Sequence, residues 1–192
     1  MATTEHTIND ALAELLRETR RAWRTAHVVS SENTGMLVGS NKRPDILVVE
    51  PSVSPVAIET EVVPATTVES DAIDRLGELA RTSGRPILSS IAVRLPERLK
   101  MHSGTSLQKQ LAGATDLEMA LYTGSQPGNY LRWPQSGWLN GGVADLSILT
   151  QSASVPPAII DQAANQLVEG VSEAGGLLGE MAHAHPGAMQ EI

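Results

Sequence analysis

The chain of 192 residues has no cysteine and no phenylalanine, and its other aromatic residues are three Trp and two Tyr. The absence of cysteine excludes a disulfide scaffold, a thiolate zinc site, an iron–sulfur cluster and a cysteine nucleophile. With so few aromatics the core must be aliphatic, and a base-stacking platform for nucleic acid is not expected. Any metal ion in this protein should therefore be bound by oxygen atoms.

The chain also lacks long apolar runs. None approaches the ~18 residues that a membrane span needs, and the opening MATTEHTINDALAELL is too polar for a signal peptide. We therefore expect a cytoplasmic protein with no membrane partner. The length suits one domain of ~100–200 residues with an appendage, which we place at residues 1–150 and 151–192.

Positive charge is scarce in the second half of the chain. The formal net charge is −8, yet residues 1–110 hold 13 of the 14 Lys and Arg and 14 of the 22 Asp and Glu. Residues 111–192 hold one arginine and eight acids. The nearly neutral first part carries its cations in clusters, so a local phosphate-binding face is compatible with the acidic total.

Apolar periodicity indicates an α/β protein. A helix is predicted over residues 8–24, with its arginines on the face opposite the apolar one. Further patterns predict strands at 36–38, 45–50 and 56–62, a helix at 66–84, a strand at 86–96, a helix at 105–112, strands at 117–124 and 129–134, and helices at 142–150 and 156–183. This order predicts a mixed central sheet flanked by helices, with a C-terminal helical extension.

The most informative segment is RPDILVVEPSVSPVAIETE, residues 43–61. Two β-rich runs joined by PSVSP predict an antiparallel hairpin centred near Val53, in which Asp45 faces Glu61. Residues that are opposed, or two apart along a strand, share one face of a sheet. Asp45, Glu59 and Glu61 should therefore converge, and three carboxylates repel one another unless a cation neutralises them or some take up protons.

Oxygen ligands on a hairpin suit a hard divalent ion, Mg²⁺ above all, with Mn²⁺ as an alternative. Such an ion polarises a phosphate and lowers the pKa of a bound water for in-line attack, with Glu61 as general base or second ligand. Lys42 and Arg43 are candidates to hold the phosphate or to stabilise the developing charge. The competing interpretation is a solvated face of alternating acids.

The segments RPDILVVE and VAIETEV resemble the PD-(D/E)xK nuclease superfamily, which has the restriction-endonuclease-like fold. Over residues 8–95 the predicted elements follow the order of that fold's αβββαβ core: a helix, a three-strand meander, a helix and a further strand. The resemblance implies a Mg²⁺-dependent endonuclease that hydrolyses DNA phosphodiester bonds, in a restriction or phage-defence system.

Carried onto this chain, the resemblance assigns Asp45 to the aspartate of the motif and Glu59 to its (D/E) position. The family often has an acidic residue on the first helix that reaches the metal, and we expect Glu18 in that role, with Glu14 second. The expected metal ligands are therefore Asp45, Glu59 and Glu18.

The chain departs from the motif at Glu61, where lysine is expected. Some restriction enzymes of this fold have a similar E-x-E variant and remain active, and Lys42 is an alternative source of the cation. The residues expected to contact DNA are the clustered arginines Arg17, Arg20, Arg21, Arg24 and Arg43.

Two other interpretations stay open. The same fold could lack catalysis and bind nucleic acid or a protein partner within a larger assembly, which Glu61 and the acidic second half favour. The apolar stripe of the predicted helix 156–183 could also form a homodimer, because such a stripe needs a partner or must fold back on the sheet.

Overall fold

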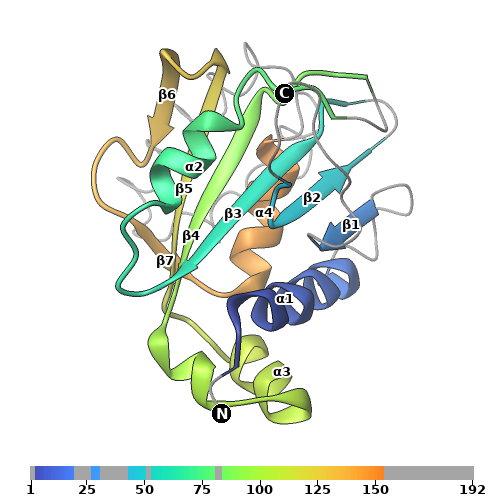
Figure 1. The fold of residues 1–192 in the computed structure, drawn as a ribbon, viewed down its shortest axis with the longest axis vertical. Helices are drawn as coiled ribbons and strands as arrows, with labels where there is room; N and C mark the ends of the chain where they lie inside the picture. The colour runs from blue at the N-terminus through green and yellow to red at the C-terminus, as the bar shows by residue number, and fades with distance from the viewer. Residues whose placement is uncertain (1–2, 20–26, 31–42, 51–52, 81–83, 154–192) are drawn as a thin grey trace, which may run out of the picture.

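A helix, three antiparallel strands, a second helix and a further strand form the first half of the molecule (Figure 1). The computed structural model describes residues 3–19, 27–30, 43–50, 53–80 and 84–153. The predicted order of elements over this half is confirmed. The elements are α1 (Glu5–Thr19), β1 (His27–Ser30), β2 (Ile46–Val49), β3 (Val56–Val62), α2 (Val68–Asp74) and β4 (Ser89–Leu95).

The second half adds helices and antiparallel strands to the same sheet. The predicted helices at 105–112 and 142–150 and the strands at 117–124 and 129–134 are all present, while η1 and β7 were not predicted. The elements are η1 (Glu97–Met101), α3 (Gly104–Ala112), β5 (Leu117–Gln126), β6 (Asn129–Trp133), β7 (Leu139–Gly141) and α4 (Val143–Ala153).

The sheet has seven strands in the order β1-β2-β3-β4-β5-β6, with β7 also paired to β5. Strands β3 and β4 are parallel and the other neighbouring pairs are antiparallel, so the predicted mixed sheet is confirmed. Because β3 and β4 run in the same direction, the chain must cross over between them, and α2 lies in that crossover.

Each face of the sheet packs against helices. Helices α1, α3 and α4 bury the larger aliphatic core against one face, to which β3 contributes Val56, Ile58 and Val62. Helix α2 packs on the other face, against β3, β4 and β5. Side chains alternate along a strand, so Glu59 and Glu61 lie on the α2 face while Thr60 faces α1.

The first helix begins earlier than its apolar pattern predicts, at Glu5 instead of residue 8. Strand β1 lies at His27–Ser30, ahead of the predicted first strand. The predicted strand 36–38 and the predicted helix 156–183 fall outside the described residues. Within those residues, no helix is long and apolar enough to cross a membrane.

The second helix is much shorter than the predicted 66–84, because it ends at Asp74. Gly77 has a φ of 84°, and a Cβ at this position would lie 2.8 Å from the carbonyl oxygen of Ser125. A left-handed residue cannot continue an α-helix, and glycine adopts that conformation without steric cost. The chain instead turns back, and Ile87 bonds to the backbone of Gly77 and Glu78.

Strands β2 and β3 form the predicted antiparallel pair, but the predicted register is wrong. Ile46 pairs with Ile58, and Val48 pairs with Val56. One residue further in the same register, position 45 lies opposite Glu59 and not opposite Glu61. This register places aliphatic residues opposite one another on the α1 face. The predicted register would have paired Ile46 with the polar Thr60.

Candidate functional site

The candidate site begins where β2 stops covering the edge of β3. Strand pairing between them reaches only Ile58. Beyond it, side-chain carboxylates accept the backbone N–H groups of β3: Asp45 Oδ2 accepts from Thr60 at 2.9 Å, and Glu5 Oε1 accepts from Val62 at 3.2 Å. These bonds satisfy donors that would otherwise be unpaired at the sheet edge and hold both carboxylates against β3.

A buried polar contact ties this edge to α1. The Thr60 hydroxyl donates to the Asn9 Oδ1, and both side chains are buried. Burying an amide without a partner is costly, so this bond fixes the position of α1 relative to β3. Asn9 is thus the residue of the first helix that is linked, through Thr60, to Asp45.

On the α2 face, Glu59 forms a buried ion pair. Its side chain is 4% exposed, and its Oε1 lies 2.5 Å from the Nε of Arg75, whose side chain is also 4% exposed. Arg75 follows directly after α2, and its Nη1 lies 3.4 Å from the Glu78 Oε1. A buried arginine of this kind is stable only with carboxylate partners, and here it has two.

The carboxyl groups of Asp45 and Glu59 are neighbours, because the register leads from the Ile46–Ile58 pair to positions 45 and 59. Burial and the negative charge of Asp45 raise the pKa of Glu59 well above its usual value, although Arg75 acts in the opposite direction. Two neighbouring carboxyl groups in a poorly solvated place attract a proton or a cation, because ionising both requires a counter-charge. Asp45 and Glu59 are therefore the candidate pair of this site.

Glu61 does not join that pair, contrary to the predicted cluster of three. Its carboxylate accepts the backbone N–H groups of Thr66 and Thr67, and also the Thr67 hydroxyl at 2.5 Å. These groups lie just before α2, so Glu61 anchors the start of that helix. Burial acts to raise the pKa of Glu61, but the hydrogen bonds from Thr67 and Thr66 outweigh it and lower the pKa below its usual value.

This lowered pKa predicts a pH-dependent contribution of Glu61 to stability. An acid whose pKa is lower in the folded state stabilises the fold above its unfolded pKa, and the contribution disappears as pH falls through the folded value. We expect Glu61→Gln to be less stable than the wild type by about 1 kcal/mol at neutral pH. The difference should shrink as the pH falls below ~4.5, the range in which an unperturbed glutamate takes up its proton.

Urea unfolding of the two proteins at several pH values measures this difference. Glu97→Gln is the matched control, because Glu97 is an exposed acid in the first turn of η1. A constant difference between Glu61→Gln and the wild type across the pH range would contradict the anchoring role of the ionised carboxylate.

The structure does not bring the other predicted metal ligands to the pair. Glu18 and Glu14 are exposed on α1, and Glu14 accepts from Gln108 of α3 at 2.7 Å. Glu18 lies nine residues beyond Asn9, or about 13 Å along the helix axis. The arrangement of α1 therefore favours Asn9 and Glu5 as the helix residues near the pair.

The predicted cationic residues are only partly described. Arg17 is exposed on the last turn of α1, and Arg43 is exposed just before β2. Lys42, predicted to replace the motif lysine, lies outside the described residues, as do three of the predicted DNA-contacting arginines, Arg20, Arg21 and Arg24.

Three residues of the site were not singled out from the sequence: Glu5, Asn9 and Arg75. Each reaches β3 from another element, and a contact between elements leaves no spacing signal in a single sequence. For Arg75, a weak signal existed, because it is the one lysine or arginine between Arg43 and Arg81. A lone cation in an acidic stretch indicates an ion-pair partner without identifying it.

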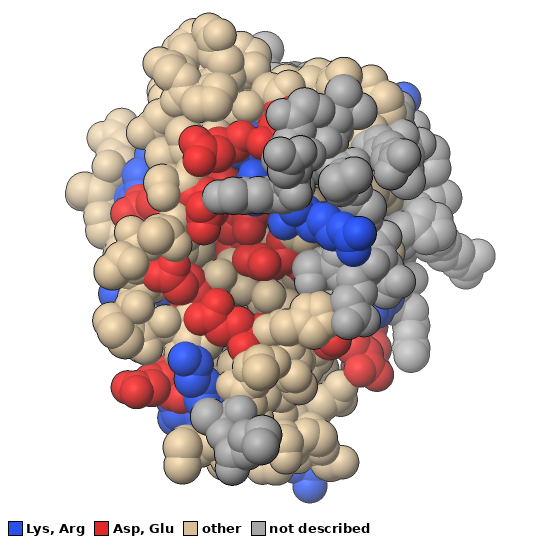
Figure 2. Space-filling model, viewed as in Figure 1, with Lys and Arg blue, Asp and Glu red and all other residues tan. Residues whose placement is uncertain are grey.

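Acidic side chains gather on the face of the sheet that carries α2, the face to which Glu59 belongs (Figure 2). Figure 2 shows Asp and Glu side chains gathered over the middle of the face that carries α2. Two carboxylates completed by water are a common donor set for Mg²⁺, so Asp45 and Glu59 fit such an ion. No group of three or more acidic, histidine or cysteine side chains suited to a metal occurs among the described residues.

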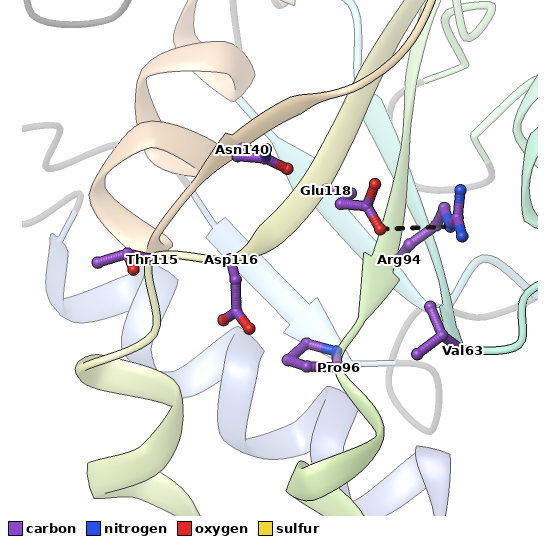
Figure 3. Close-up of a pocket in the computed structure, with 7 residues that line it drawn as sticks. All are labelled: Val63, Arg94, Pro96, Thr115, Asp116, Glu118 and Asn140. Carbon is purple, nitrogen blue, oxygen red and sulfur yellow. Dashed lines mark ion pairs between the residues drawn. The ribbon is translucent and has the colours of Figure 1, made fainter.

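A second polar feature lies further along the same face. Arg94 of β4 is in register with Glu61 of β3 and Glu118 of β5, and its Nε is 3.7 Å from the Glu118 Oε1 (Figure 3). Asp116 is paired with Arg98, at 2.7 Å between Oδ1 and Nη2. Arg94, Asp116 and Glu118 border a pocket of about 400 Å³, which is lined by Val63, Arg94, Pro96, Thr115, Asp116, Glu118 and Asn140. Asp116 is paired with Arg98, and Glu118 with Arg94. The negative charge at this pocket is therefore already compensated, and the pocket is a weaker candidate for a cation site than the Asp45–Glu59 pair.

Comparison of the chain with protein-family models, curated proteins and solved structures gave no match. The site is therefore interpreted from its own geometry and from the sequence motif.

Proposed function

We propose that the protein is a Mg²⁺-dependent nuclease that hydrolyses DNA phosphodiester bonds, with Asp45 and Glu59 as the metal ligands. The observation that carries this proposal is the geometry at the edge of β3, where the register leads from the Ile46–Ile58 pair to positions 45 and 59 and the Asp45 Oδ2 accepts the Thr60 N–H at 2.9 Å. Asp45 directly precedes β2 and Glu59 lies in the middle of β3, and the sequence resemblance assigns these two residues to the two acids of the PD-(D/E)xK motif.

The charges around the pair support the binding of a further cation there. Arg75 pairs with both Glu59 and Glu78, and the negative charge of Asp45 also acts on Glu59. Neutralising the remaining negative charge requires protons or a metal ion, and the oxygen donors of the buried Glu59 and the half-buried Asp45 suit a hard divalent ion. When bound, Mg²⁺ would polarise the scissile phosphate and lower the pKa of an attacking water.

The element order and strand directions also support a restriction-endonuclease-like core. Helix α1 lies on one face of the sheet and α2 on the other, and α2 connects the meander β1–β3 to the parallel strand β4. In this arrangement Asp45, just before β2 begins, and Glu59 of β3 are neighbours. We propose a role in restriction or phage defence on the same basis.

Within this proposal, Glu61 is a structural residue and not the general base. A carboxylate whose pKa is lowered by hydrogen bonds is a weaker base than an ordinary glutamate. Its hydrogen bonds to Thr66 and Thr67 hold α2 against the end of β3, and thereby keep Arg75 close to Glu59.

The full chain should cleave duplex DNA when Mg²⁺ or Mn²⁺ is supplied, and chelation of the metal should remove the activity completely. The assay compares supercoiled, linear and single-stranded DNA, with RNA as a further substrate, because the site geometry does not distinguish these forms. Restoring the metal after chelation should restore cleavage. Failure to cut any of these nucleic acids with either metal would contradict the proposal.

One observation favours a second candidate, a catalytically inactive module of the same fold that binds nucleic acid or a protein partner. Asp45, Glu59 and Glu61 each have an intramolecular partner: the Thr60 N–H, Arg75 and the start of α2. Under this alternative the three acids only stabilise the fold. Calorimetry would then show no binding of Mg²⁺ or Mn²⁺, and the cleavage assay would be negative.

A further inference from the structure

The residue whose role extends beyond ion pairing is Arg75. Its guanidinium lies between two acids, with Nε 2.5 Å from the Glu59 Oε1 and Nη1 3.4 Å from the Glu78 Oε1. Both Arg75 and Glu59 side chains are 4% exposed. The shorter contact goes to Glu59, which the register places beside Asp45, so the cation and the proposed metal use the same carboxylate.

We propose that Arg75 is a resident counter-cation of the Asp45–Glu59 pair, which a divalent ion displaces toward Glu78. This inference rests on the proposed function, because it requires a metal at the pair. Without metal, Arg75 neutralises Glu59 and permits its burial. With metal, Glu59 gains a doubly charged partner and Arg75 keeps Glu78.

The physical basis is competition between two cations for one buried carboxylate. A guanidinium and a divalent ion close to the same oxygen repel each other, and this repulsion is strong where water is scarce. Glu78 gives Arg75 a second position within reach, because its side chain is already 3.4 Å from Nη1 and is 17% exposed. Arg75 should therefore weaken metal binding while it stabilises the metal-free protein.

Calorimetric titration of the full chain with Mn²⁺ tests the competition. We expect Arg75→Gln to bind Mn²⁺ at least ~10-fold more tightly than the wild type, because the repelling charge is lost. Arg75→Lys keeps the charge and should stay within about threefold of the wild type. Glu78→Gln removes the second position of Arg75 and should weaken Mn²⁺ binding about tenfold.

Two controls separate failure of this inference from failure of the proposed function. Asp45→Asn should lose Mn²⁺ binding whether or not Arg75 is present. If Asp45→Asn loses binding but Arg75→Gln binds Mn²⁺ no more tightly than the wild type, Arg75 only positions Glu59 and the competition is wrong. If neither the wild type nor Arg75→Gln binds Mn²⁺, the metal site itself is wrong.

A measurement on the wild type avoids any folding defect of Arg75→Gln. The Nε–H of Arg75 donates to Glu59, so its NMR resonance reports on that bond and can be assigned by comparison with Arg75→Lys. We expect the resonance to shift as Mg²⁺ saturates the protein. A resonance that stays unchanged at saturation would overturn the displacement of Arg75.

Discussion

Replacing Asp45 by asparagine should reduce metal-dependent DNA cleavage by roughly a thousandfold or more, because several kcal/mol of metal-derived transition-state stabilisation is lost. Asparagine has the same shape, and its amide oxygen can still accept the Thr60 N–H that Asp45 Oδ2 accepts at 2.9 Å. The free energy of unfolding should therefore fall by no more than about 1 kcal/mol. Rates of plasmid nicking under single-turnover conditions, together with urea unfolding, measure both effects.

Glu5→Gln is the matched control for this substitution. Glu5 accepts the Val62 N–H at the same edge of β3, two residues beyond the bond made by Asp45. Both variants exchange an edge carboxylate for an amide, but only Asp45 acts on Glu59, whose pKa it raises. Comparable stabilities with cleavage lost in Asp45→Asn alone would assign the loss to the metal pair. Full cleavage by Asp45→Asn would refute the assignment.

The sheet could be predicted from sequence where the pattern is local. The run 56–62 alternates between an aliphatic face and a polar face, and β3 has those bounds in the structure. The antiparallel pairing with β2 follows from the short Pro- and Ser-containing connection. Strand bounds and the pairing of neighbouring strands depend on patterns within a few consecutive residues, and such patterns can be recognised in a single sequence.

Register and contacts between elements could not be obtained in the same way. A shift of two residues in the hairpin keeps every side chain on its face, so the alternation cannot detect it. The true register depends on which aliphatic residues pack beneath α1. Only in that register does Asp45 lie beside Glu59 and leave Glu61 for the start of α2.

The placement of α1 illustrates the same limit. Its periodicity identified the apolar face correctly, since Leu12 and Leu16 are fully buried. Periodicity carries no information about the position of a helix along its own axis relative to the sheet. That position brings Asn9 to Thr60 and leaves Glu18 exposed, so the choice of Glu18 rested on an unknown axial placement.

Substitutions of Glu59 should separate its structural role from its catalytic one. Glu59→Ala leaves Arg75 buried without its nearest carboxylate, and removing one partner of a buried ion pair costs about 3–5 kcal/mol of unfolding free energy. Glu59→Gln should cost much less, because the amide oxygen can accept from Arg75 and the amide nitrogen can donate to Asp45.

Both variants should lose cleavage by roughly a thousandfold, because neither supplies a second carboxylate for Mg²⁺. The double variant Glu59→Met with Arg75→Met should regain most of the stability that Glu59→Ala loses, since a hydrophobic pair of similar volume often replaces a buried ion pair without loss. Urea unfolding of the wild type, Glu59→Met, Arg75→Met and the double variant gives the coupling between the two side chains, and Glu59→Ala and Glu59→Gln are measured beside them. If Glu59→Ala were as stable as Glu59→Gln, the ion pair would contribute nothing to the fold. Arg75 would then not bind Glu59 strongly enough to compete with a metal ion, and the competition proposed above would be wrong.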